Sequence, residues 1–376
     1  MHTRHPPSHH RRRGAYIEEN WKGAFHLTDT LFEYDHLPMR SEYRMPNIHS
    51  HLTSYLTIIR KVIFMSIRAG LFRRMMRSQN INPIAHPEMQ EKMKAMSAKY
   101  CHTKPKKGYM LECLTTESGT KYQRMKKENA VSSGKVIYYI HGGCYISGLT
   151  YNYRDFCAPF CDLAEGVEII LLDYTLMPDN CYPTQLNEAL DLWSELTVKQ
   201  NINPEHIIIG GDSSGGNLAL ALMLKLKDTG SALPNSIFLL SPWTDMTASG
   251  ESYVKNYKRD VEIGDKNGMF DGQTKQKLLS SYLYDYIGDN NRTDPYISPA
   301  FADYSDFPPM LLFAGEDEML LDDTLTVYEK AKKSGVDVKL ETQPKMFHSY
   351  VLYTNYMPES QHSYQTLKEF IADRLK

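Results

Sequence analysis

The stretch IIIGGDSSGGNLALALML, residues 207–224, places two adjacent serines between an apolar run and a segment with helical spacing. The pattern G-x-S-x-G fits with Ser213 at its centre, whereas centring it on Ser214 needs a glycine where the chain has Asp212. This pattern is typical of a strained strand-to-helix turn in which small residues leave a serine hydroxyl exposed. Ser213 is therefore the candidate nucleophile, near the positive end of the following helix.

Two other interpretations of this turn can be checked against the rest of the chain. A phosphate-binding P-loop needs a lysine that this glycine pattern lacks, and the G-x-G-x-x-G spacing of dinucleotide sites is also missing. A trypsin-like nucleophile needs its histidine and aspartate before the serine in a mostly β chain. The turn lies instead in a chain of alternating strands and helices.

From about residue 109, short apolar runs alternate with longer stretches of helical spacing. Several runs are continuously apolar, which is typical of parallel strands covered on both faces. The predicted strands are 135–141, 168–174, 207–211, 236–242, 309–315 and 338–344, and the predicted helices are 183–200, 216–230 and 325–335. This order predicts an α/β fold with a mostly parallel, doubly wound sheet and helices on both faces.

Two regions interrupt the alternation. Residues 1–108 show helical spacing without strand-like runs, and residues 245–305 are too long for a simple connection. We expect 1–108 to form an N-terminal tail and helical cap region, 109–376 the catalytic domain, and 245–305 a further part of the cap. The basic amphipathic segment 52–72 is expected to pack on its own protein, with a membrane surface as the less favoured alternative.

A serine nucleophile needs a base within hydrogen-bond reach. If the order is serine, acid, histidine, as in α/β hydrolases, the base is one of the two histidines that follow Ser213. His362 lies in a predicted amphipathic helix, which is typical of a surface residue. His348 follows the strand 338–344 on a loop, so His348 is the predicted base.

The base in turn needs an orienting carboxylate. The stretch AGEDEMLLDD, residues 314–323, follows a predicted strand and holds five acids: Glu316, Asp317, Glu318, Asp322 and Asp323. Most of these are expected to be solvated or to lie in the first turn of a helix, where acids are favoured. The position just past the strand favours Asp317, with Glu316 or Asp322 as alternatives.

Backbone donors for an oxyanion are expected after the strand 135–141. Glycines in the sequence HGGC, residues 141–144, let amides approach a substrate carbonyl without an intervening Cβ. The predicted donors are the amides of Gly142, Gly143 and Ser214. His141 precedes them and is predicted to shape the loop rather than act as a second base.

Composition narrows the function classes. The 376 residues carry 43 Lys and Arg against 45 Asp and Glu, so no general affinity for nucleic acid is expected. The six cysteines form no CxxC pair and favour reduced thiols in a cytosolic protein. The basic N-terminus is not followed by the apolar run of a secretory signal, so we expect a cytoplasmic protein.

Six motifs resemble, in order, the hormone-sensitive-lipase-like family of α/β hydrolases, the carboxylesterases, acetyl esterases and lactone hydrolases with an HGGG motif. They are HGGC at 141–144, DYTLMPDNCYP at 173–183, GDSSGGN at 211–217, SPWTD at 241–245, AGEDEMLLDD at 314–323 and the loop around His348. The resemblance spans about 109–376 and implies the α/β-hydrolase fold with a helical cap. Carried over, it gives Ser213 as nucleophile, Asp317 as acid and His348 as base. It also gives Gly142, Gly143 and Ser214 as oxyanion donors.

Two positions depart from the family pattern, since Cys144 replaces the third glycine and Ser214 the usual small residue, often alanine, after the nucleophile. The expected function is hydrolysis of short to medium acyl esters or small lactones through an acyl-enzyme, without metal or organic cofactor. The expected partner is a small-molecule substrate, and the oligomeric state is left open. A non-catalytic ligand-binding protein on the same fold and an amidase are the alternatives.

Overall fold

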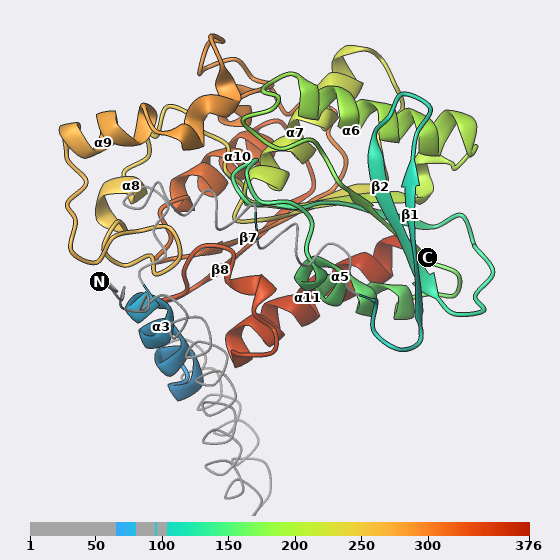
Figure 1. Cartoon of the computed structure of the whole chain (residues 1–376), viewed down its shortest axis with the longest axis horizontal. Helices are drawn as coiled ribbons and strands as arrows, with labels where there is room; N and C mark the ends of the chain where they lie inside the picture. The colour runs from blue at the N-terminus through green and yellow to red at the C-terminus, as the bar shows by residue number, and fades with distance from the viewer. Residues whose placement is uncertain (1–64, 80–94, 96–103) are drawn as a thin grey trace, which may run out of the picture. The chain divides into compact units, whose positions relative to one another are not determined.

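A computed structural model of the chain describes residues 65–79, 95 and 104–376, whose strands form one eight-stranded sheet (Figure 1). The strands are β1 Tyr109–Thr115, β2 Lys121–Lys127, β3 Val136–Ile140, β4 Glu168–Leu172, β5 Ile207–Asp212, β6 Ser236–Leu240, β7 Met310–Gly315 and β8 Val338–Gln343. Their order in the sheet is β1-β2-β4-β3-β5-β6-β7-β8. The strands from β4 to β8 pair in parallel, and β2 pairs antiparallel with both β1 and β4.

Helices cover both faces of this sheet. The α-helices are α3 Ile67–Gln79, α5 Tyr151–Cys157, α6 Thr184–Ser194, α7 Ser213–Asp228, α8 Ser252–Lys255, α9 Gly272–Leu279, α10 Leu321–Lys333 and α11 Pro358–Arg374. Short helical turns are η2 Ala158–Asp162, η3 Glu195–Lys199, η4 Pro204–His206, η5 Tyr282–Ile287, η6 Pro299–Phe301 and η7 Tyr350–Leu352. Helices α6, α7 and α10 lie on one face, and α3, α5 and α11 on the other (Figure 1).

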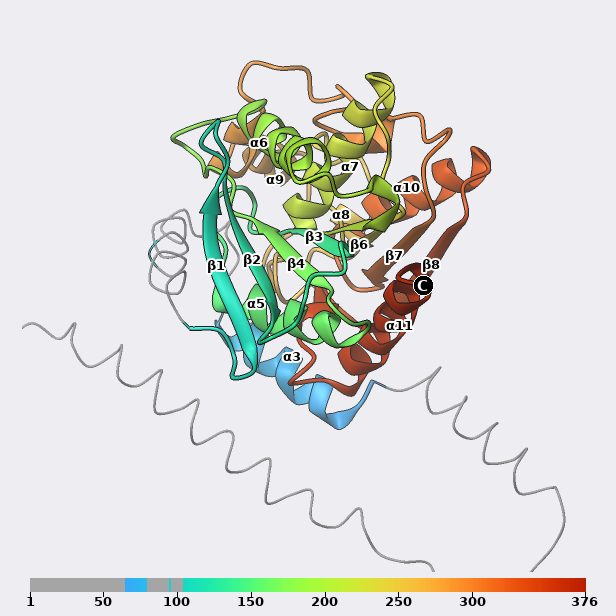
Figure 2. The same cartoon turned by 90° about the vertical axis from the view of Figure 1, so that its right-hand side faces the viewer.

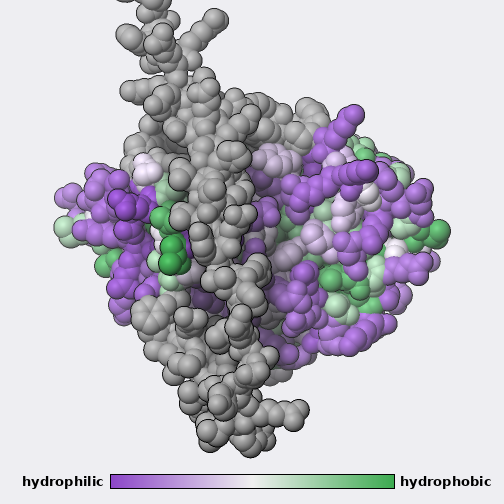
Figure 3. Space-filling view, turned by 90° about the horizontal axis from the view of Figure 1, so that it is seen from below, coloured by the Kyte–Doolittle hydropathy of each residue, from purple (hydrophilic) through white to green (hydrophobic). Residues whose placement is uncertain are grey.

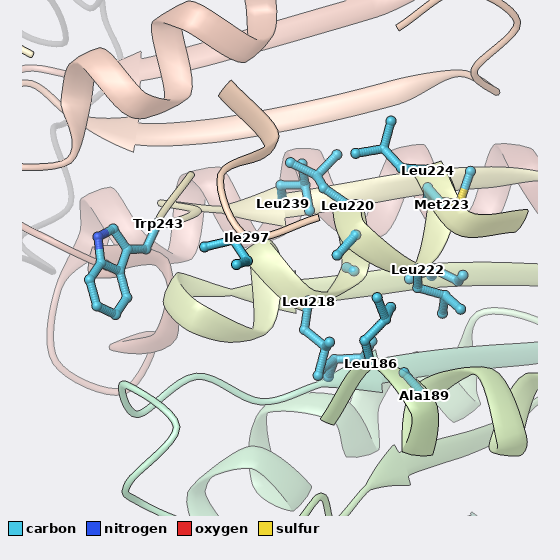
Figure 4. Packing of buried hydrophobic residues seen from close by; sticks show 14 of the residues in the cluster. Leu186, Ala189, Leu218, Leu220, Leu222, Met223, Leu224, Leu239, Trp243 and Ile297 are labelled. Carbon is cyan, nitrogen blue, oxygen red and sulfur yellow. The ribbon is translucent and has the colours of Figure 1, made fainter. Parts of the chain in front are cut away.

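Successive side chains of the central strands point alternately into two apolar layers, one on each face of the sheet. Tyr138 and Ile140 of β3 point to the layer under α6, α7 and α10, whereas Ile137 and Tyr139 point to the opposite layer. Figure 4 shows the first layer, in which Leu218 of α7 points toward Leu186 of α6. Because both faces are covered there, strands β3 to β7 are buried along their whole length, as expected for a parallel sheet.

The six predicted strands are all present as β3 to β8, and the predicted α/β architecture with a mostly parallel sheet is confirmed. The hairpin of β1 and β2 was not predicted. Its sequences YMLECLT and KYQRMKK mix charged with apolar side chains, because this edge of the sheet is covered incompletely. Figure 2 shows the hairpin at one edge of the twisted sheet.

Helix α3 belongs to the same compact unit, Lys61–Lys376, as the sheet. Ala69, Phe72 and Met76 are buried on its inner face, whereas Ile67 and Leu71 are exposed. The described part of segment 52–72 thus packs on its own protein, as expected, and residues 52–64 lie outside the described residues. From below, the coloured surface is mostly hydrophilic with small hydrophobic groups (Figure 3). No helix in the described ranges is both long and apolar enough to cross a bilayer.

Candidate active site

Ser213 lies at the sharp turn between β5 and α7. Its φ of 51° is in the left-handed region, which is unusual for a residue other than glycine and is typical of a strained nucleophile turn. The flanking glycines are required by close contacts: a Cβ on Gly211 would lie 2.6 Å from the Gly215 carbonyl oxygen, and one on Gly215 would lie 2.1 Å from that of Ile140. The G-x-S-x-G spacing therefore has a steric cause.

His348 lies beside this serine, on the loop that follows β8. Its Nε2 is 3.0 Å from Ser213 Oγ and 3.3 Å from Ser349 Oγ. The side chain is buried, which lowers the pKa of His348 to about 3 and keeps the ring neutral near pH 7. A neutral imidazole that accepts a hydrogen bond from a serine hydroxyl has the geometry of a general base.

The structure does not bring Asp317 to this histidine. The Asp317 carboxylate lies 2.9 Å from Arg73 Nη2 and 3.7 Å from Arg259 Nη1. Its backbone amide donates to the Met346 carbonyl oxygen at 2.8 Å. Within the described part of the chain, no hydrogen bond joins Asp317 to His348.

Glu318, the next residue, is fully buried. Its Oε2 accepts hydrogen bonds from Ser241 Oγ at 2.6 Å and from the Gly315 amide at 2.9 Å. Ser241 Oγ in turn accepts from the Ser349 amide at 3.0 Å, which ties Glu318 to the residue after the base. Glu318 Oε1 and His348 Nδ1 are both buried without a hydrogen-bond partner in the described residues.

Burial raises the pKa of Glu318 well above its ordinary value, the opposite direction to the shift of the pKa of His348. Each group is hard to charge alone, and a carboxylate beside an imidazolium offsets both costs. Asp260 is a second buried carboxylate nearby, but the amides of Met319, Glu262 and His348 occupy its oxygens at 2.9, 3.0 and 3.5 Å. Sequence patterns had not identified Asp260.

The loop after β3 holds the residues expected to stabilise an oxyanion. His141 stacks on Tyr174 with ring centroids 4.2 Å apart and donates from Nδ1 to the Gly142 carbonyl oxygen at 2.8 Å. Burial lowers the pKa of His141 to about 4, so its ring is neutral near pH 7. Gly143 follows with a φ of 109° and Cys144 with a φ of 56°.

The Gly142 amide is already occupied. It donates to Asp212 Oδ1 at 2.9 Å, and the hydroxyl of Tyr139 donates to the same oxygen at 2.8 Å. Asp212 is buried, and burial raises its pKa to about 6. The amides of Gly143 and Cys144 donate no hydrogen bond within the described residues. The Ser214 amide lies in the first turn of α7, where backbone donors have no partner inside the helix.

A small apolar pocket opens onto Ser213 and His348, with a cavity volume of about 50 Å³. Segment 245–305 contributes about half of its wall. The lining residues are Cys144, Ser213, Trp243, Tyr253, Ile263, Leu278, Leu283, Tyr284, Met319, Leu320 and His348. Tyr286 of η5 also stacks on Tyr145 of the oxyanion loop, with centroids 3.7 Å apart, which fixes this segment over the pocket.

In the described ranges, no group of three or more His, Cys, Asp or Glu side chains is arranged to hold a metal ion. The chemistry available there is that of an apolar pocket with a serine, a neutral histidine, a buried carboxylate and unused backbone amides.

Comparisons with known proteins confirm the expected α/β-hydrolase fold. A family model described as the α/β hydrolase fold matches residues 137–352. An esterase from Acinetobacter venetianus is 33% identical over 255 residues, 67% of this chain and 79% of the relative. An acetyl-hydrolase from Streptomyces hygroscopicus is 29% identical over 242 residues, 64% of this chain and 77% of the relative.

Solved structures give the same result. A crystal structure of an esterase from the bacterial hormone-sensitive lipase family matches with a TM-score of 0.70 and 25% sequence identity. The match covers 84% of this chain and 100% of the esterase chain. A hormone-sensitive-lipase homologue from a metagenome library has a TM-score of 0.69 and 27% identity, covering 83% of this chain and 100% of its own.

Proposed function

Because the chain belongs to the hormone-sensitive-lipase-like family of α/β hydrolases and is a carboxylester hydrolase, we propose that it cleaves short-acyl esters through a Ser213 acyl-enzyme. The observation that carries the proposal is the 3.0 Å contact between His348 Nε2 and Ser213 Oγ, two residues that line an apolar pocket. A serine hydroxyl, a neutral base within hydrogen-bond reach and a pocket for the acyl group are what acyl transfer needs.

In the first step, His348 takes the Ser213 proton while Ser213 Oγ attacks the ester carbonyl carbon. The tetrahedral intermediate then collapses, and the alcohol leaves with the proton from His348. Water adds to the acyl-enzyme in the second step by the same route, which releases the acid and restores both side chains.

Glu318 is the carboxylate that we assign to orient His348, in place of the sequence-based choice of Asp317. Support comes from its complete burial and from its unpartnered Oε1, which matches the unpartnered His348 Nδ1. Asp317 is instead paired with Arg73. A buried carboxylate can hold the imidazole in one tautomer and stabilise the imidazolium that forms in each step.

The oxyanion hole is assigned to the amides of Gly143 and Ser214, with the Cys144 amide as the third donor. Gly142 was expected to contribute, but its N–H is committed to Asp212. We assign Asp212 the role of holding the loop so that the next two amides face the substrate. Each donor is expected to contribute roughly a hundredfold or more to the rate.

The size of the pocket supports a proposal for the substrate class. A cavity of about 50 Å³ lined by apolar side chains favours an acyl group of only a few carbon atoms. Acetyl and propionyl esters are the expected substrates, and small lactones are a further class to test.

Steady-state hydrolysis of p-nitrophenyl acetate, propionate, butyrate and octanoate tests this proposal. We expect the highest kcat/KM for acetate or propionate and no turnover by Ser213→Ala. Absence of turnover on every ester, with hydrolysis of p-nitroacetanilide instead, points to an amidase. Binding of these compounds without hydrolysis points to a ligand-binding protein.

A further inference from the structure

Three contacts of helix α3 lie next to the buried groups of the proposed site, although α3 is far from them in sequence. Arg73 Nη2 donates to Asp317 Oδ2 at 2.9 Å and to the Arg259 carbonyl oxygen at 3.1 Å. Phe72 stacks near Phe347, with ring centroids 6.2 Å apart. Each contacted residue immediately precedes a site residue: Glu318, Asp260 and His348.

Asp260 connects the three segments from inside. Its Oδ2 accepts from the Met319 amide at 2.9 Å, next to Glu318, and its Oδ1 lies 3.5 Å from the His348 amide. Arg73 and Asp260 therefore both connect neighbouring segments of the site. Arg73 joins Arg259 to Asp317, and Asp260 joins the segments of Met319 and His348. The Arg73 and Asp317 side chains are only 12% and 16% exposed, so the ion pair is largely shielded from solvent.

We propose that Arg73 is a positioning residue, which fixes the turn of Asp317 so that Glu318 lies against His348. The proposal rests on the function proposed above and gives Asp317 a role other than that of the orienting acid. The Asp317 side chain has one other charged contact among the described residues: Arg259 lies 3.7 Å away, and the Arg259 side chain is 63% exposed. Arg73 Nη2 donates to both acceptors, and the planar guanidinium holds its two N–H bonds in fixed directions, whereas the ammonium of a lysine rotates freely.

The test is the kinetics of full-length variants with p-nitrophenyl acetate. Arg73→Met and Asp317→Asn are expected to lower kcat about tenfold with KM within twofold of the wild type, since small misplacement of a catalytic group is costly. Arg73→Lys should recover part of the loss. The double variant Arg73→Met/Asp317→Asn should be no slower than either single variant, because both remove the same contact.

Arg77→Met is the matched control. Arg77 is on the same helix and donates to the carbonyl oxygens of Lys258 and Arg259 at 3.1 and 3.4 Å, without touching Asp317. Its variant is expected to keep the wild-type kcat.

An unchanged kcat in Arg73→Met or additive losses in the double variant would overturn the proposal. An equal loss of kcat in Arg77→Met would also overturn it, because the loss would then come from a general effect of helix docking. If Arg73→Met does not fold, as judged by circular dichroism, Arg73→Lys and Asp317→Asn decide in the same way. Failure of the proposed function is distinct, because the wild type itself then hydrolyses no ester.

Discussion

His348 Nε2 lies 3.0 Å from Ser213 Oγ, although 135 residues separate the two in the sequence. The contact arises because β5 and β8 are parallel strands of one sheet, so that the loops after them emerge at the same edge. The same edge carries the loops after β3 and β7, which bring the free amides and the buried carboxylate. One sheet edge thus assembles every group that the proposed reaction uses.

The two adjacent serines are expected to respond differently to substitution. Ser213→Ala removes the nucleophile and should lower kcat for p-nitrophenyl acetate at least about 10⁴-fold. Ser214→Ala keeps the backbone amide and should retain activity within a few-fold of the wild type. An equally deep loss in both variants contradicts the assignment of Ser213.

The orienting acid is decided by comparing Glu318→Gln with Asp317→Asn. Glu318→Gln is expected to lower kcat about 10³- to 10⁴-fold, because a neutral amide does not stabilise the imidazolium. Asp317→Asn is expected to cost only about tenfold, through the position of the turn. The reverse ranking, measured as kcat at pH 8, makes Asp317 the acid.

The thiol of Cys144 is expected to limit acyl length. Cys144 lines the pocket beside Ser213, where the family pattern has glycine. Cys144→Ala should raise the butyrate-to-acetate ratio of kcat/KM about tenfold, since one methylene in an apolar pocket is worth about that much. Cys144→Ser, of nearly the same size, and Cys113→Ala, at an exposed free cysteine, are the controls. An unchanged ratio in Cys144→Ala excludes this role.

The protonation of Asp212 should make the stability of the fold depend on pH. Its contribution to the free energy of unfolding should be larger in acid than near neutral pH. Burial raises its pKa from 3.8 to about 6. Between these pH values the folded protein holds a proton that the unfolded chain releases, so this contribution to stability is complete at low pH and is lost as the pH rises through about 6.

The side chain of Asp212→Asn does not titrate, so the variant has no such dependence on pH. The free energy of unfolding of Asp212→Asn minus that of the wild type should therefore rise between about pH 4 and pH 7, by up to about 3 kcal/mol for a shift of this size. Urea unfolding of both proteins at several pH values measures the difference. A difference that does not change with pH shows that the pKa of Asp212 is not raised.

Much of the fold was predictable because a strand that is buried on both faces has a recognisable run of apolar residues in the sequence. Strands β3 to β7 are mostly apolar runs that are buried along their whole length, and the turn at Ser213 has its own glycine spacing. The hairpin of β1 and β2 has no such apolar run. Its strands contain polar and charged residues such as Gln123 and Lys126, which are also common in loops.

The site was less predictable where distant contacts choose between neighbours. Asp317 and Glu318 both follow β7, and the sequence does not show which one turns inward. That choice depends on the Asp317 amide bond to Met346 and on Arg73, 244 residues away. Likewise the Gly142 amide is taken by Asp212, 70 residues further along the chain.

The central claim is that Ser213 forms the covalent intermediate, and labelling with a p-nitrophenyl phosphonate ester tests it most directly. Such an ester phosphonylates the serine that attacks it and releases p-nitrophenol. Peptide mass mapping of the full chain should find one phosphonyl group per molecule on Ser213, retained in Ser214→Ala and lost in His348→Ala. A phosphonyl group on Ser214, or none on an enzyme that hydrolyses p-nitrophenyl acetate, would contradict the account.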